Sequence, residues 1–188
     1  FAAYRSGILQ MNEFVNLTAI KEPEEFTLKH FVDSVACCVL PEYRKAELLI
    51  DVGTGAGFPG VPLAILSPVK ELCESIGVVN VRTVHGRAED LAGSFEHREK
   101  YDMCVSRAVA NLSVLAEYCL PFVKTGGYMV AYKGADAENE IADAKRAMKI
   151  LGASECKSKD VFIGNEAKNH KMLIIKKDGK TPSKYPRK

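Results

Sequence analysis

The fold of this chain is decided by the stretch Leu48-Leu-Ile-Asp-Val-Gly-Thr-Gly-Ala-Gly-Phe-Pro-Gly60. Its apolar residues, Leu48, Leu49, Ile50 and Val52, predict a strand that is buried on both faces of a sheet. Four glycines follow at positions 53, 55, 57 and 60. Glycine lets the backbone turn sharply and approach a ligand with no side chain in between. The stretch therefore predicts a ligand-binding turn, whereas a turn without a ligand would leave the entropic cost of four glycines unexplained.

The spacing of the glycines indicates the kind of ligand. The dinucleotide fingerprint G-x-G-x-x-G, started at Gly53, requires a glycine at position 58, where the chain has Phe58. An NAD-dependent dehydrogenase is therefore excluded. The chain instead reads G-x-G-x-G after the acidic Asp51. This pattern resembles the loop of class I methyltransferases, which hold S-adenosylmethionine rather than a pyrophosphate.

The composition is that of an ordinary globular protein. Hydrophobic residues make up 47% of the 188 residues and charged residues 27%, which fits one domain or one domain with an appendage. No apolar run approaches the roughly 20 residues that span a bilayer, so we expect no membrane partner. The chain starts without a methionine and without a signal-peptide pattern, so we expect its true start to lie upstream.

The six cysteines show no C-x-x-C pair and no spacing typical of metal ligands, so we expect no metal site. Cys104 and Cys119 have apolar neighbours in the sequence and are expected to be buried thiols. Free thiols fit a reducing compartment, which predicts a cytoplasmic location.

The net charge of +2 hides an asymmetry along the chain. Residues 157–188 hold ten Lys or Arg against three acidic residues, a balance of +7, so the remainder carries −5. A basic end on an acidic body favours a polyanionic partner. A solvated tail explains the same charge equally well.

Apolar periodicity predicts helices before the glycine stretch and alternating strands and helices after it. The expected helices are a short one containing Ile8, Met11 and Val15, one from Pro23 to Val39 with the apolar stripe Leu28, Phe31, Val32, Val35 and Val39, and then Val61–Leu66, Ser113–Leu120 and Ala135–Leu151. The expected later strands are Val81–His85, Tyr101–Ser106, Gly127–Tyr132, Val161–Ile163 and Lys171–Lys176. The connection between the last two is too short for a parallel crossover and predicts an antiparallel pair.

These elements predict an α/β fold in a single domain. Helices over residues 1–45 precede a Rossmann-like core over residues 46–188, whose sheet is mostly parallel and ends in an antiparallel hairpin. In such a fold, a second strand should follow the first helix after the glycine stretch and should end in an acidic residue that binds the ribose hydroxyls. The sequence does not provide this strand. Leu66-Ser-Pro68 instead runs directly into residues 69–77, which read as a helix with a Gly C-cap.

Either the protein has lost this strand, or residues near positions 66–71 are absent from the sequence. We favour the second explanation, because loss of a central strand would open the sheet. A break in the Cα spacing between about Leu66 and Glu71 would show it, since bonded neighbours lie ~3.8 Å apart.

Motifs along nearly the whole chain resemble the bacterial RsmG (GidB) family of 16S rRNA (guanine-N7) methyltransferases. The glycine stretch alone indicates only a methyltransferase, whereas Phe58-Pro-Gly60 together with Ser106-Arg-Ala-Val-Ala110 is far more specific. The other motifs that carry the resemblance are Asn16-Leu-Thr-Ala-Ile20, His30-Phe-Val-Asp-Ser34, His85-Gly-Arg-Ala-Glu-Asp90, Tyr132-Lys-Gly134 and Lys184-Tyr-Pro-Arg187.

The resemblance implies that the chain binds S-adenosylmethionine and methylates N7 of a guanine in 16S rRNA. A glycine backbone can touch the methionine portion, Phe58 offers an apolar surface, and the Arg107 guanidinium can bind the methionine carboxylate or an RNA phosphate. The alternatives are a helix N-terminal acid for Glu89 and a surface ion pair for Arg107. The residues that the family assigns to the cofactor are Gly53, Thr54, Gly55, Phe58, Ala88, Glu89 and Arg107.

The reaction asks little of acid–base groups. Guanine N7 carries a lone pair and no proton, and the sulfonium is already activated, so we expect catalysis by alignment and nominate no catalytic residue. Asn16, Thr18 and Lys133 are expected to position the base or a phosphate. His30 and Asp33 are expected to bind the substrate, with a structural His–Asp pair as the alternative.

N7 lies in the major groove, which in A-form RNA is too deep and narrow for side chains, so the target must be unpaired or extruded. The basic C-terminal segment, including Arg187, is expected to hold the RNA backbone; the alternative is a strut that packs back on the sheet. The expected partner is 16S rRNA or a precursor of the small ribosomal subunit, bound by a monomer. A small-molecule methyltransferase would need no basic terminus, and a non-catalytic RNA-binding module would leave the glycine stretch unexplained.

Overall fold

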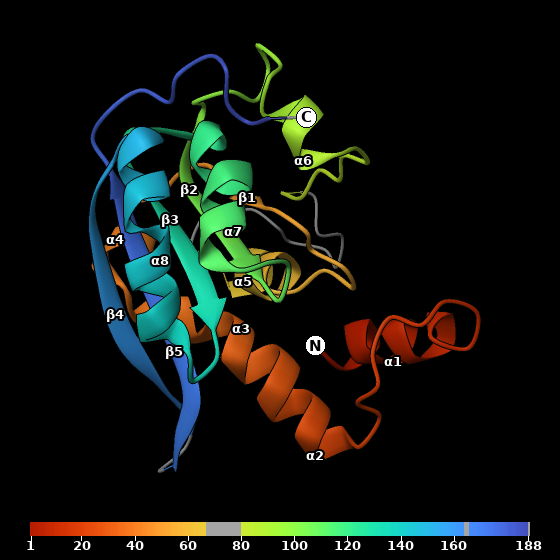
Figure 1. Ribbon diagram of the computed structural model, residues 1–188. Helices are drawn as coiled ribbons and strands as arrows, with labels where there is room; N and C mark the ends of the chain where they lie inside the picture. Colours follow the sequence, from red (N-terminus) through yellow and green to blue (C-terminus); the bar gives the residue numbers. More distant parts are fainter. Residues whose placement is uncertain (67–79, 164–165, 188) are drawn as a thin grey trace. The chain divides into compact units, whose positions relative to one another are not determined.

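The computed structural model of the chain describes residues 1–66, 80–163 and 166–187 (Figure 1). The chain divides into two compact units. We call residues 1–36 and 54–83 the N-terminal unit, and residues 37–53 and 84–188 the sheet unit. The glycine stretch is shared, because Gly53 belongs to the sheet unit and the later glycines belong to the N-terminal unit.

The sheet unit holds a five-stranded sheet with the order β1-β2-β3-β5-β4. The first three strands are parallel, and β5 pairs antiparallel with both β3 and β4. This confirms the predicted mostly parallel sheet with a C-terminal antiparallel hairpin. The hairpin strands are longer than the sequence predicts, so the loop between them is shorter. The strands are β1 (Leu49–Asp51), β2 (Tyr101–Arg107), β3 (Val123–Lys133), β4 (Ala153–Ile163) and β5 (Glu166–Lys177).

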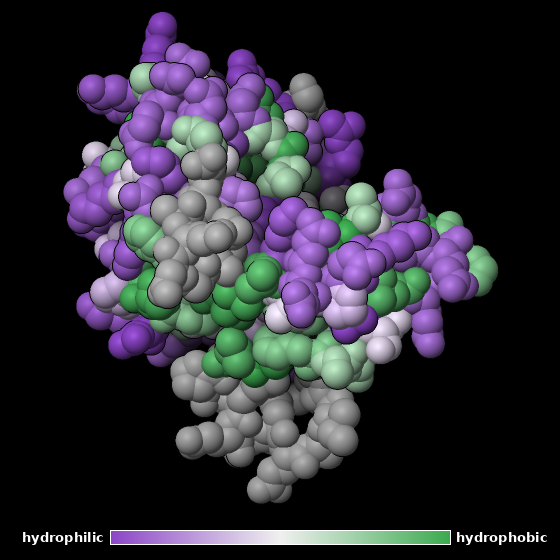
Figure 2. Space-filling view, turned by 90° about the horizontal axis from the view of Figure 1, so that it is seen from below, coloured by the Kyte–Doolittle hydropathy of each residue, from purple (hydrophilic) through white to green (hydrophobic). Residues whose placement is uncertain are grey.

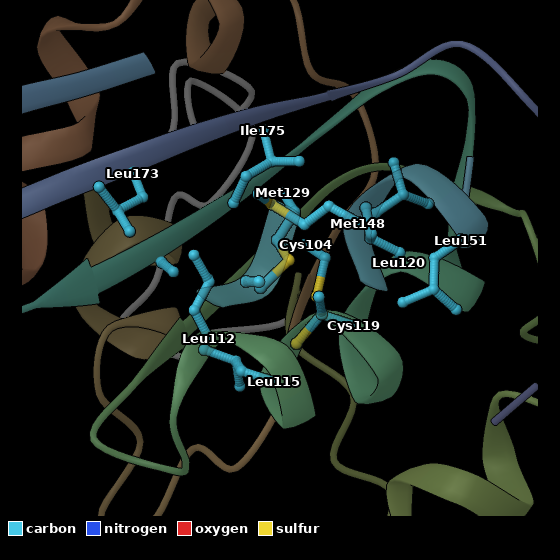
Figure 3. Packing of buried hydrophobic residues seen from close by; sticks show 14 of the residues in the cluster. Cys104, Leu112, Leu115, Cys119, Leu120, Met129, Met148, Leu151, Leu173 and Ile175 are labelled. Carbon is cyan, nitrogen blue, oxygen red and sulfur yellow. The ribbon is translucent and has the colours of Figure 1, made fainter. Parts of the chain in front are cut away.

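Helices α7 (Leu112–Cys119) and α8 (Ala137–Ile150) lie side by side on one face of this sheet (Figure 1). Their apolar side chains meet those of β2, β3 and β5 in the main core, which is drawn in Figure 3. Cys104 and Cys119 are fully buried in this core, as the sequence predicts. The central strands β2 and β3 are buried along most of their length, which explains why their sequences read as nearly continuous apolar runs.

The first strand differs from its prediction. β1 is only three residues long and half-buried, because within the described residues it pairs with β2 alone and forms the end of the sheet. The predicted strand Val81–His85 is wrong: these residues form neither helix nor strand and are exposed. A strand needs a neighbour that satisfies its backbone groups, and the strand expected between β1 and this segment is the one that the sequence does not provide. The predicted helix over 69–77 and the predicted break in Cα spacing lie outside the described residues.

The N-terminal unit begins with α1 (Ala2–Met11) and continues with a longer helical stretch from Pro23. Proline occupies the first helical position of that stretch, as predicted. The predicted apolar stripe is only partly right, because Leu28 is exposed while Phe26 is fully buried. The cause is a π-helical segment, whose wider turn shifts the buried face. The successive parts are α2 (Pro23–Phe26), η1 (Thr27–Val32), α3 (Asp33–Val35) and η2 (Ala36–Val39), the last in the sheet unit with α4 (Pro41–Arg44).

The glycine stretch leads into helix α5 (Gly60–Leu66), as predicted.

On the surface, hydrophobic residues lie among hydrophilic ones (Figure 2), and the exposed apolar side chains include Phe14 and Phe95. In the part of the chain that the structure describes, no helix has the length and apolar character that crossing a membrane requires.

Candidate active site

The carboxyl ends of β1 and β2 bring two predicted cofactor residues to the same edge of the sheet. β1 ends at Asp51, which is paired with Val105, and β2 ends at Arg107. The backbone of Val52 is fixed on both sides, because its N–H donates to the Val105 carbonyl at 3.0 Å and its carbonyl accepts from the Ser106 hydroxyl at 2.8 Å. Ligands of open α/β sheets bind at this edge. The structure therefore places Gly53 and Arg107 where a cofactor is expected.

Gly53 makes room for a protein side chain that the sequence analysis did not consider. Its φ is +76°, and a Cβ at this position would collide with Cγ2 of Val109. Val109 lies in the loop after β2, in which Ala108 also has a positive φ, of 56°. A glycine is therefore required at position 53 by the backbone conformation and by the packing of Val109.

In the N-terminal unit, the glycine stretch forms a turn around Thr54. The Thr54 carbonyl accepts hydrogen bonds from the N–H groups of Gly57 and Phe58 at 2.8 and 2.9 Å. Gly55 has a φ of +54°, and nothing lies within 4 Å of the place where its Cβ would be. Gly57, by contrast, is covered by Tyr4, whose hydroxyl donates to the Ala56 carbonyl. Gly55 is thus the position of the turn that is open to a ligand.

The ring of Phe58, which is predicted to offer an apolar surface to the cofactor, packs against other aromatic rings of the protein. Phe58 is only 6% exposed and belongs to an aromatic cluster with Phe26 and Phe31. Its ring stacks on His30 with centroids 4.6 Å apart and an interplanar angle of 8°. The assignment of Phe58 to the cofactor stays a prediction, and any contact must be made by its backbone or by the small part of the ring that is exposed.

The two N-terminal motifs meet in this unit. Nε2 of His30 and the hydroxyl of Thr18 lie 2.8 Å apart. Asn12, which the sequence analysis missed, organises the loop: its Oδ1 accepts from the N–H groups of Leu17 and Thr18 at 2.7 and 2.9 Å, and its Nδ2 donates to the Thr18 carbonyl at 2.9 Å. The hydroxyl, the N–H and the carbonyl of Thr18 are therefore each fixed by a polar contact.

Of the other predicted substrate residues in this unit, Asn16 is exposed, whereas Asp33 is buried at 3% exposure. Asn16 remains open to a substrate. Asp33 lies inside the helical stretch, in the α3 segment.

The predicted adenine-binding residues lie in the sheet unit at helix α6 (Ala88–Leu91). Arg87 donates to the Glu89 carboxylate at 2.9 Å, and this hydrogen bond holds the pKa of Glu89 below its usual range. An ionised Glu89 is an acceptor, which suits an exocyclic amine or a ribose hydroxyl. A hollow of about 400 Å³ opens beside this helix, with Glu89, Asp90 and Ser94 on one side and Ser183, Tyr185 and Pro186 on the other.

This hollow is distinct from the turn at Gly53, because neither Gly53 nor Arg107 lines it. It contains a single predicted site residue, Glu89. The hollow is therefore not the place at which the sequence predicts the methionine end of a cofactor.

The basic C-terminal segment packs back on the sheet unit, and we call residues 178–187 the C-terminal strap. Arg98 anchors it by donating to three of its carbonyls, those of Thr181, Pro182 and Tyr185, at 2.9, 3.1 and 2.9 Å. The Thr181 hydroxyl donates to the Leu151 carbonyl at 2.8 Å. The strut reading of this segment is therefore what the structure shows.

Two of the predicted RNA-binding cations belong to this structural network. Nζ of Lys177 is fully buried and donates to Glu99 at 2.9 Å and to the carbonyls of Leu120 and Val123 at 2.8 and 2.7 Å. Arg187 binds the Glu117 carboxylate through Nε and Nη2 at 2.9 and 2.6 Å, which holds the pKa of Glu117 below its usual range. The role of Arg187 toward RNA stays a prediction.

Lys133 also has protein partners. Its Nζ donates to the Ala110 carbonyl and pairs with Glu140, both at 2.6 Å, and only 9% of its side chain is exposed. Glu140, Val109 and Arg98 are not predictable from the sequence, since a single acidic, apolar or basic residue in a helix or loop carries no signal of its partner. The pairing of Lys133 with Glu140 is visible only in the structure.

The residues present fit S-adenosylmethionine. Within the sheet unit, the carboxyl edge of β2 offers the Arg107 guanidinium for a carboxylate, and α6 offers the Glu89 carboxylate. The zwitterionic amino acid and the adenosine of the cofactor need these donor and acceptor types.

Comparisons with known proteins identify the family and the fold of the chain. The model of the family "rRNA small subunit methyltransferase G" matches residues 1–73 and 68–168. The enzyme of that name from Alkaliphilus metalliredigens is 44% identical over 202 residues, which cover 98% of this chain and 84% of the relative. The one from Clostridium novyi is 43% identical over 204 residues, which cover 100% of this chain and 84% of the relative.

Solved structures share the fold. The methyltransferase SibL has a TM-score of 0.58 at 12% identity, covering 95% of this chain and 77% of its own. An S-adenosylmethionine-dependent O-methyltransferase from Thermotoga maritima has a TM-score of 0.53 at 13% identity, covering 95% and 73%. The structural likeness confirms the class I methyltransferase fold, and the sequence match identifies the family. This chain belongs to the rRNA small subunit methyltransferase G family, whose members are S-adenosylmethionine-dependent rRNA methyltransferases.

Proposed function

We propose that the chain transfers the methyl group of S-adenosylmethionine to N7 of a guanine in 16S rRNA. The observation that carries the proposal is the family match over nearly the whole chain, together with a glycine turn and an arginine at the carboxyl edge of the sheet. S-adenosylmethionine supplies an electrophilic methyl group on a positively charged sulfur. With the cofactor bound, the lone pair of N7 would form the new N–C bond while the S–C bond breaks and its electron pair stays on the sulfur.

The contribution of the protein is to hold and align the two reactants. We assign the backbone of Gly53 and Gly55 and the Arg107 guanidinium to the methionine end, and Ala88 and Glu89 to the adenosine. Alignment of this kind converts a bimolecular step into an effectively unimolecular one. Guanine N7 needs no deprotonation, so no residue acts as a general base.

The N-terminal unit is assigned to the guanine and its phosphate. The hydroxyl of Thr18 is fixed by His30, the backbone of Thr18 is fixed by Asn12, and Asn16, two residues earlier in the chain, is exposed. His30 therefore acts by holding Thr18, and the buried Asp33 supports the helix that carries His30.

Methyl transfer at saturating substrate is expected to be flat with pH between about 6 and 9. A general-base mechanism through His30 would give a rate that rises with pH across this range, because only the neutral imidazole accepts a proton. The measurement is single-turnover methylation of 16S rRNA with both reactants saturating. A rate that climbs through that region and loses its climb in His30→Gln would contradict the alignment mechanism.

RNA binding by the C-terminal strap is expected to depend on Lys180 and Lys184, the strap lysines for which the described residues provide no ion pair. Neutralising both should lower the slope of log affinity against log salt by roughly 0.7–0.9 for each phosphate that is no longer neutralised. Affinity for S-adenosylmethionine should not change, and the melting temperature should change little, since the only contact of either side chain among the interactions described is that of Lys184 with the Tyr185 ring, at 5.3 Å. An unchanged salt slope would leave the strap with a structural role only.

The reaction itself is tested by labelling. Purified protein is incubated with methyl-labelled S-adenosylmethionine and unmethylated 16S rRNA, and the digested RNA is analysed for N7-methylguanosine. Label in this nucleoside supports the proposal. Label in another nucleoside, or only in a small-molecule acceptor, would assign the fold to a different methyl transfer.

A further inference from the structure

The loop between β2 and α7 is fastened at two backbone points by one ion pair. Nζ of Lys133 donates to the Ala110 carbonyl at 2.6 Å. Oε2 of Glu140 accepts from the Leu112 N–H at 2.6 Å, and from Lys133 at the same distance. Lys133 is the last residue of β3, and Glu140 lies in the first turn of α8. The pair thus ties this loop to the connection between β3 and α8.

The pair is shielded from water to a degree that surface pairs are not. The exposed fraction of its side chains is 9% for Lys133 and 23% for Glu140. Charged hydrogen bonds in such surroundings are stronger and less screened by salt than those of exposed pairs. Removing either Lys133 or Glu140 should therefore have a larger effect than removing one partner of an exposed pair.

The fastened loop has a strained backbone and a defined contact. Ala108 has a φ of +56°, a conformation that residues other than glycine adopt only where the surroundings impose it. Val109 next to it fills the space beside Gly53 that a side chain there would occupy. The loop therefore needs an external constraint to stay against Gly53, and the two hydrogen bonds at Ala110 and Leu112 provide it.

We propose that Lys133 and Glu140 are a positioning pair that holds the loop Arg107–Ala110 against Gly53, so that this part of the cofactor site is preformed before S-adenosylmethionine binds. The proposal rests on the proposed function in that Gly53 and Arg107 are taken to bind the cofactor. It gives Lys133 a role different from contact with guanine or phosphate.

The test uses Lys133→Met and Glu140→Gln in the full chain, without RNA. Each change should weaken S-adenosylmethionine binding in calorimetry by about tenfold, because the apparent affinity falls with the fraction of molecules whose loop is in place. Amide hydrogen exchange at residues 108–112 should accelerate in the absence of cofactor. In methylation assays the KM for S-adenosylmethionine should rise, while kcat at saturation should change by less than about threefold.

The chain offers a matched control on the same helical turn. Glu138 pairs with Lys171 at 3.0 Å, but 63% of its side chain is exposed and neither residue bonds the loop. Glu138→Gln should leave both cofactor affinity and loop exchange unchanged. Lys133→Arg, which keeps the charge and the donors, should recover most of the affinity that Lys133→Met loses.

Other outcomes overturn the proposal. If Lys133→Met weakens RNA binding and flattens its salt dependence while cofactor affinity and loop exchange stay unchanged, Lys133 is a substrate residue. If exchange accelerates but cofactor affinity is unchanged, the pair fixes the loop without serving the cofactor. Arg107→Ala then separates the causes: an unchanged affinity in this variant shows that the cofactor assignment of the loop failed, and a lost affinity shows that only the positioning role failed.

Discussion

Replacing Lys177 with methionine is expected to lower the free energy of unfolding by about 3 kcal/mol, the range found when one partner of a buried ion pair is removed. Methionine keeps the length of the side chain but donates no hydrogen bonds. Glu99 then loses its cation, and the carbonyls of Leu120 and Val123 lose a buried donor. For a chain of 188 residues this corresponds to a fall in melting temperature of roughly 6–12 °C.

The control is the preceding residue. Lys176 pairs with Asp178 at 3.0 Å, but 37% of its side chain is exposed, so Lys176→Met should cost about 0–1 kcal/mol. If both lysines served mainly to bind RNA, the two variants would show the same loss of RNA affinity and the same melting temperature. Equal melting temperatures would contradict the structural role of Lys177.

The loss of stability caused by Lys177→Met should also depend on pH. Burial raises the pKa of Glu99, but the hydrogen bonds from Lys177 and the Thr181 N–H outweigh it and hold the pKa below its usual range. A carboxyl with a lowered folded-state pKa stabilises the protein above its unfolded pKa of ~4.3, and loses this contribution as pH falls through the folded value. The difference in melting temperature between the wild type and Lys177→Met should therefore become smaller below about pH 4.

Gly53→Ala is expected to reduce S-adenosylmethionine affinity by more than tenfold, and Gly53→Val to abolish measurable binding. The added Cβ would collide with Val109, and an L-residue is strained at a φ of +76°. Both changes should also destabilise the loop after β2, so cofactor loss without any change in stability is not the expected result. Calorimetry and thermal melts on each variant measure the two effects.

A second substitution separates the steric cause from the backbone cause. Val109→Ala removes the colliding methyl groups, so in the double variant Gly53→Ala with Val109→Ala the affinity should partly recover. What remains is the cost of the positive φ, about 1 kcal/mol. Absence of any recovery would indicate that the space beside Gly53 is used by the cofactor itself, as the sequence alone suggests.

The sequence predicts the architecture of the sheet unit because its strands and helices have strong periodic patterns. β2, β3, α7 and α8 follow those patterns closely, and the short connection between β4 and β5 requires antiparallel pairing. Val81–His85 has the same apolar pattern but is not a strand, because pairing depends on a neighbour elsewhere in the chain. Strand propensity alone cannot supply that neighbour.

The candidate site is predictable in its position but not in its contacts. The glycine turn and Arg107 fall at the expected edge, since connectivity determines which strand ends meet. Phe58 looks like a ligand surface in the sequence, yet its ring packs on His30 in an aromatic cluster. Lys177 counts as one positive charge in any tally of the basic segment, although it is completely buried. Burial of a charge follows from partners such as Glu99 that are distant in sequence.

The comparisons bear on the missing strand as well. The matched stretch with the Clostridium novyi enzyme is 204 residues long, so at least 16 of its positions have no counterpart among the 188 residues of this chain. The two stretches matched by the family model overlap at residues 68–73. Both facts indicate that the relatives have residues in this region that the chain lacks, and they fit either of the two explanations. Sequencing the gene across this region distinguishes them: extra codons would mean that residues are absent from the sequence, and their absence would mean that the protein has lost the strand.

The three-residue β1 has a consequence for the order in which the chain folds. Its pairing joins Ile50 to Cys104, more than fifty residues away, whereas β4 and β5 join residues that are close in sequence. Contacts between distant residues carry a larger loop-closure entropy and form more slowly than local ones. The hairpin of β4 and β5 is thus expected to form early, and β1 to dock late. A newly made chain would therefore complete the turn at Gly53 as one of the last events of folding.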